Sequence, residues 1–166
     1  TKLAWVLDTV SDARSKAEAG ELAAGTIDTY LIWRLTGGDV HATEPSNASR
    51  TMLWGLTSKA GDDSRGWDGE LCALIGVPHC ILPDVRPCTG NFGTTKGVPG
   101  LPDGIPIHGV AGDQQSALFG QACFDVGEAK CTYGTGAFVM LNTGTDIVYS
   151  EHGLLTTVGW QLGDTT

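Results

Sequence analysis

The sequence predicts a folded protein of the α/β class, with helices dominating its first part and strands its last. Of the 166 residues, 41 % are hydrophobic and 17 % are charged, which is typical of a globular protein and not of a disordered segment. Apolar residues recur at helical spacing near the amino terminus, whereas short apolar stretches divided by glycines follow later. This length predicts one ordinary domain, or parts of two.

The charge balance and the cysteine content narrow the function classes. The net charge of −9 argues against nucleic acid as a partner, because binding to a phosphate backbone requires clustered positive charge. The apolar runs are too short for a membrane span, and no signal-peptide pattern opens the chain. Five cysteines without a C-x-x-C pair predict neither a disulfide framework nor a metal site, and they favour the reducing cytoplasm.

The amino-terminal part is predicted to be helical. Leu3, Val6, Leu7 and Val10 share one face at helical spacing, and the helical stretch is expected to stop near Gly20.

A further helix is predicted over residues 27–36. Thr26 is a suitable amino-terminal cap, and Gly37 with Gly38 is typical of a helix end. The aromatic ring of Trp33 is expected to pack rather than to bind a ligand. We expect four side chains of this helix to face a core, those of Ile27, Tyr30, Leu31 and Leu35.

The middle of the chain is rich in turns. Residues 61–66 are predicted to form a polar surface loop, and Asp68 is predicted to cap a short helix that ends at Gly76. Prolines and glycines recur over residues 83–102, which excludes a regular helix or a central strand there.

The last part is predicted to consist of strands and turns around one helix. Strands are expected over residues 105–111 and 154–160, and a helix over residues 114–122. Residues 129–135 and 137–142 are apolar, rich in strand-forming residues and divided by glycines, which predicts a hairpin.

A first candidate site lies where the predicted strand 105–111 ends. In Val-Ala-Gly-Asp-Gln-Gln, Asp113 stands at the mouth of a helix, a position where α/β proteins bind ligands. Its carboxylate can accept the proton of a substrate hydroxyl, and Gln114 can hold a neighbouring hydroxyl. The alternative is that Asp113 is only the helix cap, and the two roles are compatible.

A second candidate site is Tyr133-Gly134-Thr135-Gly136. Glycines let the backbone approach a ligand, and a threonine hydroxyl with free amides suits phosphate oxygens. The alternative is a tight hairpin turn, which also favours glycine. The sequence contains neither a G-x-x-x-x-G-K-[ST] phosphate loop nor a G-x-S-x-G elbow.

Several blocks in order resemble the FGGY carbohydrate kinases and, among them, the members that phosphorylate glycerol. They cover nearly the whole chain and are the segments at 25–38, 47–53 (Asn-Ala-Ser-Arg-Thr-Met-Leu), 82–87, 111–121 (Ala-Gly-Asp-Gln-Gln-Ser-Ala-Leu-Phe-Gly-Gln), 132–136 and 152–157.

The resemblance implies a fold and a reaction. The fold is the actin-like, ribonuclease H-like kinase fold, present in part. Residues 1–122 would form the later part of the first domain, and residues 123–166 would begin the second. The reaction is transfer of the γ-phosphoryl group of ATP to a hydroxyl of glycerol, assisted by Mg²⁺, which depends mostly on positioning and on neutralising charge.

The resemblance also implies residue roles. Asp113 matches the catalytic base and contacts the substrate, and Gln114 and Phe138 match substrate-binding positions. The nucleotide phosphates would meet Gly134, Thr135 and Gly136. No residue of this sequence is assigned as a metal ligand.

The chain is well under half the length of a complete family member. We therefore expect a central fragment of a longer kinase that is inactive alone, with open strand edges that favour a homo-oligomer. Residues 102–104 are Pro-Asp-Gly where the family's regulatory loop carries Gly-x-Arg. Two alternatives stay open, a kinase for another small polyol or a pentulose, and a truncated non-catalytic binding or oligomerisation module.

Overall fold

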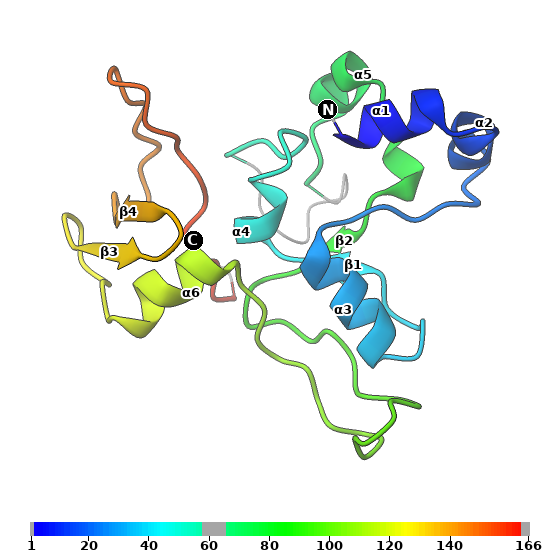
Figure 1. Cartoon of the computed structure of the whole chain (residues 1–166). Coiled ribbons are helices and arrows are strands. Elements are labelled where there is room, and N and C mark those ends of the chain that lie inside the picture. The colour runs from blue at the N-terminus through cyan, green and yellow to red at the C-terminus, as the bar shows by residue number, and fades with distance from the viewer. Residues whose placement is uncertain (1, 58–65, 164–166) are drawn as a thin grey trace.

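The computed structural model describes residues 2–57 and 66–163 (Figure 1). Short helices and strands alternate with long irregular segments. The elements in chain order are α1 (Lys2–Thr9), α2 (Ala13–Glu18), α3 (Ile27–Leu35), β1 (Ala42–Thr43), α4 (Pro45–Ala48), α5 (Gly69–Ile75), the 3₁₀ helix η1 (His79–Ile81), β2 (Asp84–Val85), α6 (Asp113–Gly120), β3 (Ala129–Tyr133) and β4 (Ala137–Leu141). Within the described residues, β1 pairs with β2 in parallel and β3 pairs with β4 antiparallel.

The larger hydrophobic core lies among α1, α2, α5 and the segment that leads into β2. Within this core Trp54 meets Trp67 edge to face, with the ring centroids 5.8 Å apart. The predicted amino-terminal helix is confirmed as α1, which buries Leu7. A left-handed turn at Asp12 then starts α2, and the helical stretch stops before Gly20 as predicted.

The predicted helix over residues 27–36 is confirmed as α3, and the chain leaves it through Gly37 at φ 66°. Thr26 occupies the cap position, but its hydroxyl donates to the carboxylate of Asp28 instead of accepting from a backbone amide. The hydroxyl of Thr43 on β1 donates to the other oxygen of Asp28 at 2.6 Å. A buried carboxylate, with its oxygens satisfied by hydroxyls, therefore faces β1.

The predicted core face of α3 is wrong. Ile27, Tyr30 and Leu31 are 70 %, 55 % and 50 % exposed, and Trp33 also lies at the surface. The buried face carries Asp28, Thr29 and Ile32 instead. The physical reason is that the Thr43 hydroxyl on β1 donates to Asp28 and lets that carboxylate face inward, so of the apolar side chains of α3 only Ile32 joins the small core around Ala42 and Phe92. On the opposite face the rings of Tyr30 and Trp33 meet with their centroids 6.4 Å apart, and both side chains stay exposed. Leu35, the fourth side chain expected in a core, is half-buried.

The predicted short helix is confirmed as α5. Asp68 caps it by accepting from the amide of Leu71 at 2.9 Å, and Gly76 ends it at φ 74°. Of the polar loop predicted over residues 61–66, residues 61–65 lie outside the described residues. Residues 83–102 contain no helix, as the prolines and glycines predict, and the short strand β2 at their start belongs to a two-stranded sheet and is therefore not a central strand.

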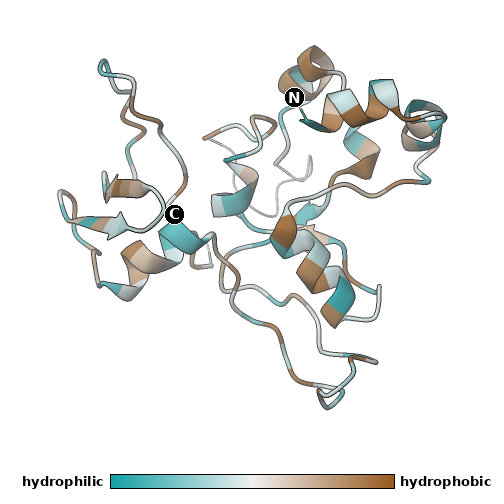
Figure 2. Cartoon of the chain, viewed as in Figure 1, coloured by the Kyte–Doolittle hydropathy of each residue, from teal (hydrophilic) through white to brown (hydrophobic). Residues whose placement is uncertain are grey.

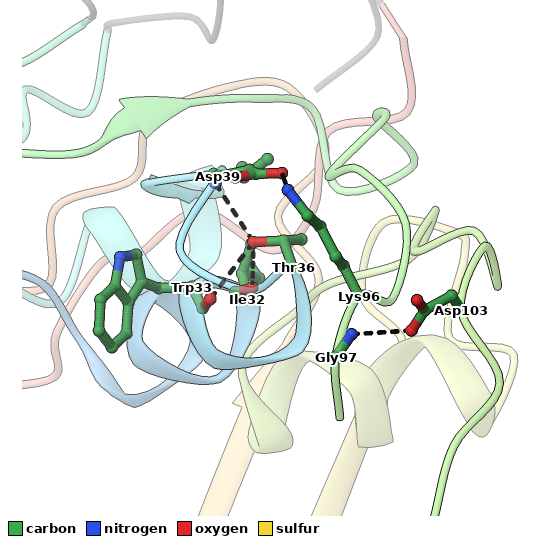
Figure 3. Close-up of polar contacts among 8 residues, drawn as sticks. Ile32, Trp33, Thr36, Asp39, Lys96, Gly97 and Asp103 are labelled. Atoms are coloured by element: carbon green, nitrogen blue, oxygen red, sulfur yellow. Dashed lines mark hydrogen bonds and ion pairs between the residues drawn. The ribbon is translucent and has the colours of Figure 1, made fainter. Parts of the chain in front are cut away.

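The irregular segment that follows β2 is held against the end of α3, as Figure 3 shows. The Lys96 ammonium donates to the Asp39 carboxylate at 2.6 Å, and the amide of Gly97 donates to the carboxylate of Asp103 at 2.7 Å. Inside the turn, the Thr36 hydroxyl donates to the carbonyl of Ile32 at 2.8 Å. The Pro-Asp-Gly at 102–104 therefore closes this loop on itself.

Two predictions for the last part of the chain are confirmed. Residues 113–120 form α6, and β3 and β4 form a hairpin whose register runs from Ala129 opposite Leu141 to Tyr133 opposite Ala137. In Figure 1 the hairpin and α6 lie side by side, away from α1, α2 and α5. Figure 2 shows hydrophobic residues along β4, where Val139 is 73 % exposed.

Two strand predictions are wrong. Residues 105–111 form a single bridge between Thr94 and Pro106, and residues 154–160 form no strand. Backbone hydrogen bonds flank this bridge, because the amide of Ile107 donates to Gly93 at 2.9 Å, but the next bond of the segment runs from the amide of Val110 to Cys88 at 2.9 Å, so no continuous ladder forms. The segment 154–160 is held instead by isolated bonds, among them the amide of Val158 donating to the Ser49 hydroxyl at 3.2 Å.

The segment after β4 returns to the earlier part of the chain. The amide of Cys88 donates to the carbonyl of Gln161 at 2.8 Å. The ring of Trp160 meets Phe119 of α6 and Phe124 edge to face, at 5.3 and 6.2 Å between centroids. This small aromatic cluster fixes α6 against the returning segment.

Candidate active site

The amino-terminal end of α6 is built on a turn at Gly112. Its amide donates to the hydroxyl of Ser46 at 2.8 Å, which anchors the turn to α4. A Cβ added at Gly112 would lie 2.7 Å from Oε1 of Gln115, so the close approach of that buried side chain explains the glycine. Asp113 then begins the helix with an exposed carboxylate.

The interpretation of Asp113 as the helix cap is wrong. Gly112 occupies the cap position, and Asp113 is the first helical residue. One carboxylate oxygen accepts from the amide of Gln114 at 2.9 Å, which leaves the exposed carboxylate able to accept further hydrogen bonds. The arrangement suits a group that orients and deprotonates a hydroxyl.

Gln114 lies beside this carboxylate and is itself held. Its Nε2 atom is 3.3 Å from Oδ2 of Asp113, and its Oε1 accepts from Nζ of Lys130. Lys130 lies on β3, is 2 % exposed, and also donates to the Thr132 hydroxyl at 2.7 Å. This lysine joins the hairpin to α6.

Behind the turn lies a fully buried carboxylate, that of Glu44. It caps α4 by accepting from the amides of Ser46 and Asn47, both at 2.7 Å, and it accepts from the Ser46 hydroxyl at 2.6 Å. Since that hydroxyl also accepts from the amide of Gly112, a continuous chain of hydrogen bonds runs from Glu44 to the residue before Asp113.

Cys88 completes this network. Its thiol donates to Glu44 at 2.9 Å and accepts from the amide of Gln161 at 3.2 Å. Burial, with the neighbouring Glu44 carboxylate, raises the pKa of Cys88 to about 12. The thiol therefore stays protonated and serves as a hydrogen-bond donor.

The second candidate site is the loop between β3 and β4. The amide of Gly134 donates to the carbonyl of Gly136 at 2.9 Å, so the tight turn expected as the alternative is present. Thr135 is exposed at its tip, and Phe138 on β4 is 54 % exposed. The turn leaves the threonine hydroxyl and the backbone accessible to a ligand.

The structure brings some of the predicted site residues together. Asp113 and Gln114 lie together, and Gly134, Thr135, Gly136 and Phe138 share the hairpin. In the described part of the chain, the hydrogen bond from Lys130 to Gln114 connects the hairpin to α6.

Lys130 and Glu44 were missed by sequence reasoning. A lysine inside an apolar hairpin strand, and a carboxylate directly before a proline that starts a helix, are the signals that could have found them. Neither signal reveals what the side chain contacts.

Over residues 2–57 and 66–163, no group of three or more His, Cys, Asp or Glu side chains is arranged to hold a metal ion. Over the same residues, no helix has the length and apolar character needed to cross a membrane.

Comparison with known proteins identifies the family of this chain. Residues 1–120 match the model of the amino-terminal domain of the FGGY family of carbohydrate kinases. The chain therefore belongs to the FGGY family.

Curated glycerol kinases are similar to this chain along nearly its whole length. A glycerol kinase of Myxococcus xanthus is 54 % identical over 165 residues, which are 99 % of this chain and 32 % of that protein. A glycerol kinase of Thermus brockianus is 55 % identical over 163 residues, 98 % of this chain and 31 % of that protein. The chain thus spans about a third of the length of the curated relatives it matches.

A solved structure is similar too. The crystal structure of Plasmodium falciparum glycerol kinase with ADP superimposes with a TM-score of 0.88 and 40 % identity, covering 96 % of this chain and 31 % of that one. This match confirms the predicted α/β kinase fold, present here in part.

Proposed function

We propose that this chain is part of a longer glycerol kinase, which transfers the γ-phosphoryl group of ATP to a hydroxyl of glycerol. The observation that carries the proposal is the exposed Asp113 carboxylate beside Gln114 at the start of α6, in a chain about half identical to curated glycerol kinases along nearly its whole length. We further propose that residues 1–122 and 123–166 belong to two domains of that kinase.

In the proposed reaction Asp113 accepts a hydrogen bond from the substrate hydroxyl. The hydroxyl oxygen attacks the γ-phosphorus, its proton passes to the Asp113 carboxylate, and the bond from that phosphorus to the leaving oxygen of ADP breaks. Gln114 binds a neighbouring hydroxyl. Phe138, half exposed on β4, offers its ring to the carbon chain of the polyol. Together these contacts orient the substrate, which is the main requirement of phosphoryl transfer.

The nucleotide is proposed to meet the loop between β3 and β4. Gly134, Thr135 and Gly136 are exposed there and offer amides and a hydroxyl to phosphate oxygens. The similar Plasmodium structure holds ADP. Mg²⁺ takes oxygen ligands and usually keeps several waters, so in the proposed complex phosphate oxygens and waters would supply its ligands. When bound, Mg²⁺ neutralises phosphate charge.

The five cysteines form no disulfide in the structure, and free thiols are typical of proteins in the reducing cytoplasm. We propose that compartment, and a homo-oligomeric state, for the whole protein.

The test is ATP-dependent phosphorylation of glycerol by the full-length polypeptide that contains this chain. We expect Asp113→Asn to lower kcat by about 10²- to 10⁴-fold, the usual contribution of a positioned base. The matched control is Asp125→Asn, an exposed aspartate in the loop after α6, which should retain activity.

Other outcomes decide between the alternatives. Turnover of erythritol or a pentulose in preference to glycerol would assign the chain to a different polyol kinase. A polypeptide that phosphorylates none of these compounds would contradict the proposed function and favour a non-catalytic module. An Asp113→Asn variant as active as an active wild type would contradict the role of Asp113 as the base.

A further inference from the structure

Lys130 is a buried ammonium group that the proposed reaction does not use. The residue is 2 % exposed, and its Nζ atom donates to Oε1 of Gln114 and to the hydroxyl of Thr132. Both partners are neutral, and in the described part of the chain no carboxylate forms an ion pair with it. Burying a charge without a counter-charge costs free energy. We therefore asked what function offsets the cost of burying this ammonium group where β3 meets α6.

Lys130 determines which way the amide of Gln114 points. An ammonium group can only donate hydrogen bonds, so the atom of Gln114 that faces it has to be the oxygen. The nitrogen of the same amide is thereby turned toward Asp113, where Nε2 lies 3.3 Å from Oδ2. The opposite orientation would place two donor groups against each other at Lys130 and two acceptors against each other at Asp113.

We propose that Lys130 is a positioning residue that fixes Gln114 as a hydrogen-bond donor to the substrate. This inference rests on the proposed function. Asp113 then accepts from the hydroxyl that is phosphorylated, while the amide nitrogen of Gln114 donates to the oxygen of the adjacent hydroxyl. One acceptor beside one donor selects a vicinal diol, in which the reacting hydroxyl donates and its neighbour accepts.

The test compares Lys130→Met with Lys96→Met in the full-length enzyme. Lys96 is the matched control, because its exposed ammonium pairs with Asp39 far along the chain from α6. We expect Lys130→Met to lower kcat/KM for glycerol by about 10- to 100-fold, the usual effect of losing a hydrogen bond to a charged group. The KM for ATP should stay within about twofold, since the loss of one orienting bond acts on the polyol side.

Substrate discrimination gives a readout that a merely structural lysine would not move. The wild type should prefer glycerol to propane-1,3-diol, which lacks the adjacent hydroxyl. Lys130→Met should reduce that preference, and Lys130→Arg, which retains a donor, should restore part of it. In a Gln114→Leu background, Lys130→Met should cause no further loss, because the amide through which it acts is gone.

If Lys130→Met does not fold, two Gln114 variants decide the matter. Gln114→Glu keeps an acceptor for Lys130 and should melt near the wild-type temperature, but it removes the donor and the preference for glycerol. Gln114→Leu deprives the buried ammonium of that acceptor and should melt at a lower temperature. Equal melting temperatures for the two variants would contradict the proposal.

Failure of this inference is distinct from failure of the proposed function. A wild-type enzyme that does not phosphorylate glycerol refutes the function itself. An active wild type in which Asp113→Asn is inactive but Lys130→Met behaves like Lys96→Met refutes only the role of Lys130. A loss confined to the KM for ATP would show that Lys130 acts through the Gly134–Gly136 loop and would also overturn the inference.

Discussion

Glu44 is a single residue on which several backbone and side-chain groups depend. Its carboxylate accepts from both the amide and the hydroxyl of Ser46, from the amide and Nδ2 of Asn47, and from the thiol of Cys88. An ionised carboxylate only accepts hydrogen bonds, so it matches a set of donors in every direction. No amide of the same shape can do this, because one end of an amide donates.

We therefore predict that Glu44→Gln destabilises the protein although the two side chains have nearly the same volume. The new NH₂ group would face donors, and a buried group left without a proper partner costs about 1–3 kcal/mol. Urea unfolding measures the loss. The control is Glu151→Gln, an exposed residue whose substitution should change the free energy of unfolding by less than about 0.5 kcal/mol. Equal stabilities for the two variants would show that Glu44 is replaceable.

At the scale of the elements, the turn before Trp67 packs directly against an aromatic ring. Gly66 has φ +72°, and a Cβ built there would lie 2.1 Å from the ring of Trp54. That ring is itself fixed edge to face on Trp67. The turn and the tryptophan pair are therefore packed as one unit.

We predict that Gly66→Ala is more destabilising than Gly20→Ala. Gly20 has the same φ of +72° but no atom within 4 Å of its Cβ position, so both variants share the left-handed backbone strain of about 1–2 kcal/mol. Only Gly66→Ala adds overpacking against Trp54, typically another 1–3 kcal/mol. The difference between their free energies of unfolding isolates the packing contribution. A difference near zero would show that the Trp54 ring moves aside freely.

Elements with strong local signals could be predicted, and those that depend on distant partners could not. The helix at 113–120 and the hairpin follow from periodicity and from glycine spacing. The strand predicted over residues 154–160 failed because apolar character does not supply a neighbouring strand. The face of α3 was predicted wrongly because Asp28 is satisfied by a hydroxyl fifteen positions away, on Thr43.

The same division holds for the candidate site. Asp113 and Gln114 are adjacent in the sequence, so the local pattern identified them. Glu44 and Lys130 act through burial and through hydrogen bonds to Cys88 and Gln114, which lie 44 and 16 positions away, and no local pattern contains such partners. Glutamate and lysine are ordinarily exposed, and composition alone assigns them to the surface.

At the scale of the whole molecule, the hairpin of β3 and β4 is a sheet of only two strands that exposes apolar side chains. Tyr133, Val139 and Leu141 are 85 %, 73 % and 57 % exposed, on a pair of strands with open edges. Exposed apolar strands with unpaired edges favour pairing with another chain.

We predict that the 166-residue chain self-associates when produced alone. Sedimentation measurements should give a weight-average mass above that of the monomer, and Val139→Lys should lower it by placing a charge on the hairpin. Val126→Lys is the control, since Val126 is equally exposed, at 73 %, but lies in the loop before β3. A monomer at high concentration, or equal effects of the two variants, would exclude the hairpin as the contact.

The return of the chain after β4 has a mechanical consequence. The hairpin leaves α6 through residues 121–128 and comes back to Ser49 and Cys88 through the segment that ends at Gln161. The hairpin is thus attached through the chain at both of its ends and through the hydrogen bond from Lys130 to Gln114. A displacement that keeps these attachments has to carry α6 with it, so the tip at Thr135 would move together with the start of α6.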